Sequence, residues 1–257
     1  MKTIIFILLG FILFTDDIYA NRNNNYINNQ NIEINHIEYY NLKSMGFTDN
    51  EIKILDKSTF QNNKDLTGEI LSRKEYFLKS INRAVQNGYV ETEYKIVTTY
   101  IIKYSNFIRY KITVEWKKMP YYRSYDIIGI GKSNNVSTDG EVNFVQNFCY
   151  KNGNCSSNYE FNLKQGENGN GASFPLVSNK NVNNIIITFF YNIKKVDNST
   201  ITKLDAYGDY KHATKNISST NANKFSVRKD LGIELEQSIL NYYDSISIAH
   251  ATWTGSW

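Results

Sequence analysis

Two copies of the tripeptide His-Ala-Thr are the residues best suited to chemistry in this chain. They begin at His212 and His250, and Asp209 lies shortly before the first copy. If the two segments pair as neighbouring strands, two imidazoles and a carboxylate converge, which are ligand types that suit Zn²⁺ or another divalent ion. Short tripeptides also recur by chance, and strand histidines commonly lie at hydrated edges. We therefore expect no metal site and no cofactor, with Asp209, His212 and His250 as the candidates if there is one.

Signatures of hydrolases are missing from the sequence. It contains neither HExxH nor GxSxG in a strand-turn-helix context. The carboxylates of Glu115, Asp126 and Glu141 flank predicted strands, and glycoside hydrolysis needs two carboxyl groups about 5 Å or about 6.5–9.5 Å apart. Solvated strand residues are the simpler interpretation. The sequence therefore favours a protein without enzymatic activity, with a secreted hydrolase as an alternative.

The two cysteines, Cys149 and Cys155, enclose five residues that include Asn152-Gly153. An Asn-Gly step is a strong signal for a hairpin turn. A redox centre of the CxxC type needs a different spacing. We therefore predict a structural disulfide that closes the ends of one β-hairpin.

Aromatic residues gather at two places in the chain. Tyr121, Tyr122 and Tyr125 form one cluster, and Trp253 and Trp257 lie at the end of the sequence. Exposed flat rings bind sugars by stacking or lie at membrane interfaces, whereas buried rings fill the core. These five residues are the candidates for ligand binding, and their exposure decides between the two interpretations.

The elements that position these residues are mainly strands. Apolar residues alternate over residues 94–104 and again over 108–116, which predicts two antiparallel strands. The other face of the second strand carries Arg109, Lys111 and Thr113, so we expect that face to contact water. Further strands are predicted over residues 125–130, 142–148, 159–163, 185–193, 201–207, 225–227 and 246–253.

Many short strands with polar turns and little helix predict an all-β fold. We expect residues 91–257 to form an antiparallel β-sandwich, jelly-roll or Ig-like in texture. A small helical or mixed segment over residues 36–90 precedes it, in which Thr48 and Glu51 fit the capping box of a helix. Residues 21–35 are rich in Asn and are predicted to be a disordered leader.

The first twenty residues predict export. An apolar run from Thr3 to Phe14 follows Lys2, and a short polar stretch ends at Ala20, which is typical of a signal peptide over residues 1–20. The run is too short to cross a bilayer, and no later stretch is long enough, so no transmembrane segment is expected after cleavage. We therefore predict a secreted, extracellular protein.

The net charge of +4 is mild and no cluster of Lys and Arg marks a nucleic-acid surface, so no nucleic-acid partner is expected. By elimination, the sequence favours a bacterial, non-enzymatic binding protein of the extracellular space or cell surface, with a glycan or a protein as its partner. A membrane-active, pore-forming toxin is an alternative, because alternating strands rich in Tyr, Thr and Ser are typical of hairpins that enter membranes. The ligand and the oligomeric state stay open, as does whether residues 21–90 are a removable pro-region.

Overall fold

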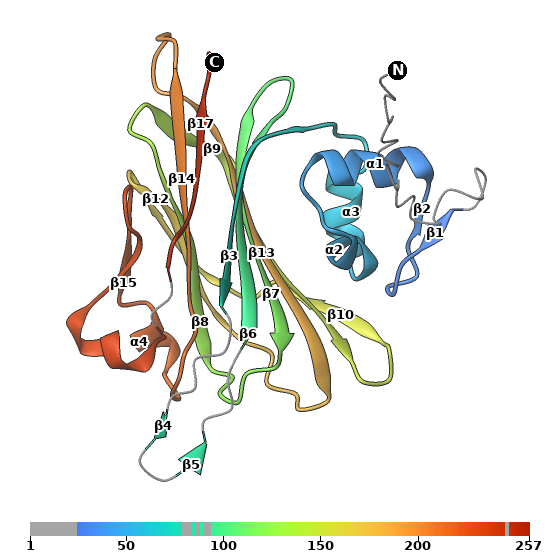
Figure 1. The fold of residues 1–257 in the computed structure, drawn as a ribbon, viewed down its shortest axis with the longest axis vertical. Coiled ribbons are helices and arrows are strands. Elements are labelled where there is room, and N and C mark those ends of the chain that lie inside the picture. Colours follow the sequence, from blue (N-terminus) through green and yellow to red (C-terminus); the bar gives the residue numbers. More distant parts are fainter. Residues whose placement is uncertain (1–24, 79–83, 86–87, 90–93, 245–246) are drawn as a thin grey trace, which may run out of the picture.

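A computed structural model describes residues 25–78, 84–85, 88–89, 94–244 and 247–257 of the protein, and two packed antiparallel sheets form its body (Figure 1). The expected signal peptide, residues 1–20, lies outside the described residues. The all-β sandwich that the alternation predicts is therefore confirmed. Within the described residues, no helix has the length and apolar character needed to span a membrane.

The larger sheet has six strands. Its order is β10 (Cys155–Asn158), β9 (Val136–Tyr150), β13 (Val182–Lys195), β7 (Ile108–Lys118), β6 (Tyr94–Lys103) and β3 (Glu69–Leu78). Strand β9 begins before the predicted strand over residues 142–148, and it carries a bulge where Val142 faces Tyr191 and Asp139 faces Asn192. Gly140 lies in this bulge with a φ of 72°, a conformation that glycine adopts without strain.

The smaller sheet has five strands. Its order is β11 (Asn162–Gly166), β12 (Gly169–Pro175), β8 (Tyr125–Lys132), β14 (Lys203–Lys211) and β17 (Ala249–Thr254). The sequence predicts a strand over 159–163 and none between it and residue 185, whereas β11 begins three residues later and β12 forms an additional strand. Glycines obscure the pattern of β12, and they are needed there because a Cβ on Gly171 would come within 2.8 Å of Val227.

Apolar side chains from both sheets meet in one core. On β7 the inward side chains include Tyr110, Ile112 and Val114, all fully buried, and β13 contributes Ile187 and Phe189 from the neighbouring position. This alternation is what the sequence predicts for a sheet packed on one face.

Three short strand pairs lie outside the two main sheets in the described part of the chain. Strands β15 (Phe225–Arg228) and β16 (Gly232–Leu235) form a hairpin near α4 (Ser219–Ala222) and the 3-10 helix η2 (Gln237–Tyr242). This C-terminal part packs against the outer side of the five-stranded sheet around Ile127. The remaining pairs are β1 (Tyr26–Ile27) with β2 (Glu33–Ile34), and β4 (Ala84–Val85) with β5 (Gly88–Tyr89).

The described part of the expected leader is ordered, contrary to the prediction from its composition. Residues 25–35 contain the β1–β2 hairpin, and Ile34 is fully buried. The Asn28 amide donates hydrogen bonds to the carbonyl oxygens of Ile52 (3.2 Å) and Leu55 (2.8 Å). Composition alone does not reveal these contacts, because they join Asn28 to α2 (Asp49–Lys53) and to the turn that follows it.

Three helices follow: α1 (His36–Ser44), α2 (Asp49–Lys53) and α3 (Lys57–Asn63). The capping box of α2 is present as predicted, with the Thr48 hydroxyl accepting from the Glu51 amide and the Glu51 carboxylate accepting from the Thr48 amide. We call residues 25–67 the helical segment. It covers the side of the six-stranded sheet that faces away from the five-stranded sheet (Figure 1).

This covering overturns two expectations. The outer face of β7 does not contact water, because Lys111 and Thr113 are buried beneath the helical segment. The expected boundary at residue 90 does not separate two units either, because β3 is hydrogen-bonded to β6 as a strand of the larger sheet.

Candidate functional site

The helical segment meets the six-stranded sheet through polar side chains, and we call this contact the seam. At its centre the Glu51 carboxylate pairs with the Lys111 ammonium at 2.8 Å and accepts a hydrogen bond from the Thr113 hydroxyl at 3.1 Å. Glu51 is 2% exposed and Lys111 is 1% exposed. Burial lowers the pKa of Lys111, and the nearby Glu51 carboxylate opposes this by favouring the charged form. The seam therefore contains a buried ion pair that ties α2 to β7.

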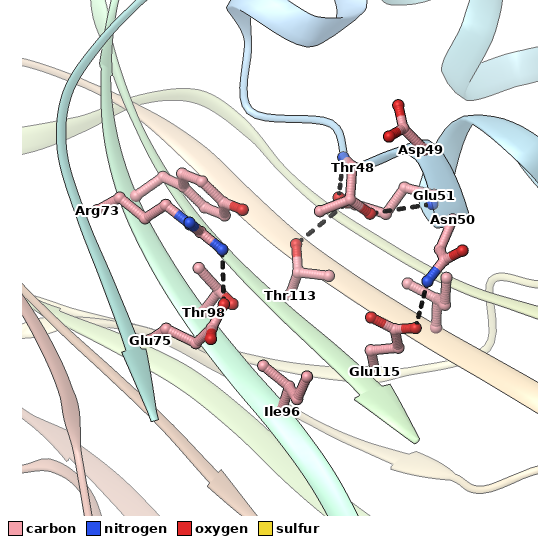
Figure 2. A pocket seen from close by; sticks show the side chains of 12 residues that line it. Thr48, Asp49, Asn50, Glu51, Arg73, Glu75, Ile96, Thr98, Thr113 and Glu115 are labelled. Atoms are coloured by element: carbon pink, nitrogen blue, oxygen red, sulfur yellow. Dashed lines mark hydrogen bonds and ion pairs between the residues drawn. The ribbon is translucent and has the colours of Figure 1, made fainter. Parts of the chain in front are cut away.

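A first pocket, the Glu51 pocket, opens beside this ion pair with a volume of about 270 Å³ (Figure 2). The first turn of α2 forms one wall, and strands β3, β6 and β7 form the other. Its charged side chains already have partners: Arg73 pairs with Glu75, and Glu115 pairs with Lys117 and accepts a hydrogen bond from Asn50 at 2.7 Å. The pocket thus offers satisfied charges rather than free ones.

A second pocket, the Arg109 pocket, has a volume of about 210 Å³. Helix α3 supplies hydroxyl and amide groups, and the sheet supplies Arg109, aromatic rings and a further amide. Its lining includes Ser58, Asn62, Asn63, Arg109, Asn143 and Phe190. Side-chain amides and hydroxyls beside aromatic rings suit a ligand that is rich in hydroxyl groups.

The two histidines of the His-Ala-Thr repeats do not meet. In the register of β14 and β17, His250 lies opposite Tyr207, whereas His212 follows the end of β14. His250 Nε2 lies 2.9 Å from the Asp205 carboxylate, and its ring stacks on Tyr207. His212 is fully buried, with Nδ1 3.0 Å from the Asp126 carboxylate.

Asp209 has a separate role from both histidines. Its carboxylate pairs with Lys211 at 3.0 Å and accepts a hydrogen bond from the Ile233 amide, and burial raises its pKa. Within the described residues, no three His, Cys, Asp or Glu side chains are grouped so that they could hold a metal ion. The three candidates Asp209, His212 and His250 therefore lie apart, each with its own partners.

The carboxylates considered for hydrolysis are also dispersed. Asp126 is fully buried and accepts hydrogen bonds from Tyr210 and from the Ala213 amide, which leaves it no access to a substrate. Glu141 is exposed on β9, and Glu115 lies in the Glu51 pocket with the partners given above. The three carboxylates therefore lie in three different surroundings and do not share one site.

The aromatic candidates divide by exposure. Tyr121 is 80% exposed and Tyr122 is 40% exposed, and their rings meet edge to face at 5.0 Å on the loop after β7. Tyr125 is half-buried and packs against the apolar cluster that the C-terminal part forms around Ile127. Trp253 and Trp257 are partly buried against the main core. Of these five candidates, Tyr121 and Tyr122 are the two that present open ring surface.

The cysteines form the expected disulfide. Cys149 and Cys155 face each other in the register of β9 and β10 and are bonded. The disulfide packs against Ile54 of the helical segment and Ile186 of β13. It therefore supports the seam as well as the hairpin.

The sequence gives little sign of the Arg109 pocket. Arg109 is predicted on a face in contact with water, and Asn62 and Asn63 belong to a short polar helix without a motif. The available signal was the pair of cations on one strand face, Arg109 and Lys111, because two cations on a covered face require partners.

Comparisons with known proteins do not assign this chain to a family. No family model matches the chain, and no curated protein matches it. Among solved structures, the pilus backbone protein of Streptococcus pneumoniae is similar at 10% identity and a TM-score of 0.31, covering 43% of this chain and 26% of that chain. The KRT10-binding region domain of the pneumococcal serine-rich repeat protein PsrP has 16% identity and a TM-score of 0.28, covering 56% of this chain and 88% of that chain.

A third similar chain comes from the structure of manganese lipoxygenase of Gaeumannomyces graminis and zonadhesin of Komagataella pastoris. It has 8% identity and a TM-score of 0.27, and the alignment covers 67% of each chain. At TM-scores this low, none of the three similarities carries an argument about this protein.

Proposed function

We propose that this protein is a secreted bacterial binding protein without enzymatic activity, which binds a glycan of a cell surface. The Arg109 pocket carries this proposal. A sugar ring presents hydroxyl groups that need fixed donors and acceptors, and apolar faces that pack on aromatic rings. The pocket combines side-chain amides of Asn62 and Asn143 with the ring of Phe190.

Two further observations support the proposal. The Cys149–Cys155 disulfide is typical of proteins in oxidising compartments, which agrees with export by a signal peptide. The exposed Tyr121–Tyr122 pair offers a second surface on which a sugar can stack.

A glycan array followed by calorimetry tests the binding. We expect the chain without residues 1–20 to bind a subset of glycans, and Asn143→Ala to weaken that binding. Asn162→Ala is the matched control, because Asn162 is an exposed strand residue that does not line the Arg109 pocket. Absence of binding to every glycan, or equal binding by the two variants, contradicts the proposal.

Export is tested separately. When the full sequence is expressed in a bacterium with a general secretion pathway, we expect the protein in the culture medium to begin at Asn21. Retention of uncleaved protein in the cytoplasm contradicts this part of the proposal.

A further inference from the structure

Arg109 is a buried cation whose hydrogen-bond partners are uncharged. The side chain lies on the outer face of β7 and the residue is 7% exposed. Its Nε donates to the Asn192 side-chain oxygen at 3.0 Å, and its Nη1 donates to the Asn63 side-chain oxygen at 2.8 Å. No carboxylate of the described part of the chain forms an ion pair with it or contributes to its pKa shift. The guanidinium therefore has neutral partners only.

Neighbouring cations of the seam differ in this respect. Lys111, two residues further along the same strand, pairs with Glu51, and Arg73 pairs with Glu75. Buried charges in proteins are generally paired, because an isolated charge loses its hydration without compensation. Burial lowers the pKa of Arg109, because the charged guanidinium loses hydration. Arg109 is thus an exception that needs an explanation.

Aromatic rings compensate Arg109 only in part. The guanidinium carbon lies 4.3 Å from the centre of the Phe190 ring, 4.9 Å from Tyr104 and 5.6 Å from Phe107. Ring faces attract cations, but they carry no net charge. Together with the two asparagines, the rings hold the guanidinium in one orientation before any ligand arrives.

The space next to this cation is the Arg109 pocket. Its other polar groups are neutral hydroxyls and amides, including Ser58, Asn62 and Asn143. Its volume of about 210 Å³ is smaller than the roughly 300–1,000 Å³ of pockets that enclose a whole drug-sized ligand. The pocket therefore has room for one unit of a longer chain, beside a positive charge without a counter-charge.

We propose that the Arg109 pocket binds the anionic group of an acidic saccharide, a carboxylate, sulfate or phosphate substituent, with Arg109 as its charge partner. The planar fork of a guanidinium matches such oxyanions, and charge-assisted hydrogen bonds are among the strongest in proteins. The inference rests on the proposed glycan-binding function and specifies the class of glycan.

Two substitutions at Asn62 test the inference without removing Arg109. Asn62 is exposed on α3 and lines the same pocket, so Asn62→Asp places a carboxylate where the ligand's anion is expected, and Asn62→Ala is the uncharged control. The probes are a hyaluronan tetrasaccharide, a heparin tetrasaccharide, a phosphorylated mannose disaccharide and neutral chitotetraose, each measured by calorimetry. The three anionic probes distinguish carboxylate, sulfate and phosphate.

We expect at least one anionic probe to bind the unmodified chain more tightly than chitotetraose, with binding that weakens as NaCl increases. Asn62→Asp should weaken it about tenfold or more, and Asn62→Ala about threefold or less. If chitotetraose binds as tightly as every anionic probe, or if Asn62→Asp and Asn62→Ala behave alike, the inference is wrong while glycan binding stands. If no saccharide on the array or among the probes binds, both proposals are wrong.

Discussion

Replacing Glu51 with Gln should destabilise this protein more than any surface substitution, because it leaves a buried ammonium without its counter-charge. Glutamine preserves the size of the side chain and can still accept hydrogen bonds from Lys111 and Thr113. What is lost is the negative charge 2.8 Å from Lys111 Nζ, at a place where both residues are almost fully buried. The other contacts of the ammonium are also neutral: the Gly46 carbonyl oxygen at 3.2 Å and the Phe47 ring, whose centre lies 3.8 Å away.

The expected size of the effect follows from this burial. Removing one partner of a buried ion pair typically costs about 3–5 kcal/mol in the free energy of unfolding. Natural domains have a total of about 5–15 kcal/mol, so the variant loses a large fraction of its stability. For a chain of this length, the loss corresponds to a decrease in Tm of about 6–20 °C.

Thermal and urea unfolding followed by circular dichroism measure the loss. The double variant Glu51→Gln with Lys111→Met removes both charges, and we expect it to recover most of the lost stability, because an apolar replacement of a buried pair is often neutral. Asp49→Asn is a matched control on the same helix, since the Asp49 side chain is 73% exposed. A decrease in Tm below about 2 °C for Glu51→Gln, or a double variant as unstable as the sum of the single variants, would refute the reasoning.

Three further predictions concern other parts of the fold. Replacing Cys149 and Cys155 with Ala should lower the free energy of unfolding by about 2 kcal/mol, as urea titration can show, and an unchanged midpoint contradicts this. Gly208→Ala should cost about 1–3 kcal/mol by the same assay, because its Cβ would lie 1.9 Å from a buried threonine hydroxyl; stability equal to that of the unmodified chain contradicts the packing. The hydrogen bond that Lys43 donates to the Asp49 carboxylate lowers the pKa of Asp49 most, and the hydrogen bond from Tyr39 lowers it further. The ionised Asp49 carboxylate therefore stabilises the folded protein slightly above about pH 4, and this contribution is lost as the pH falls through the pKa of Asp49 in the folded state. NMR titration should show that Lys43→Met raises this pKa, and an unchanged value contradicts the assignment.

Local patterns predicted the elements of this fold because the forces behind them are local. The capping box of Thr48 and Glu51 depends on backbone amides within one turn, so the sequence suffices to find it. The alternation along β7 similarly reports which side of the strand is apolar. The disulfide between Cys149 and Cys155 was predictable because a short hairpin leaves one geometry for the pair.

Contacts between distant residues were not predictable in the same way. A polar residue on a strand face can contact water or a buried partner, and the sequence does not distinguish the two. For Lys111 the partner is Glu51. The hairpin at residues 25–35 was missed for the same reason, since Asn28 is satisfied by carbonyl groups of the helical segment. The separation of His212 from His250 depends on the register of two strands, which the repeated tripeptide does not determine.

Because the walls of the Arg109 pocket come from two layers, α3 and the outer face of the six-stranded sheet, a molecule bound there touches both. Any local opening that lifts α3 from the strands must then break contacts with that molecule as well. Occupancy should consequently slow amide hydrogen exchange in α3 while leaving the distant β15–β16 hairpin unaffected. A bound molecule would therefore stabilise the closed arrangement of α3 on the sheet in proportion to its occupancy.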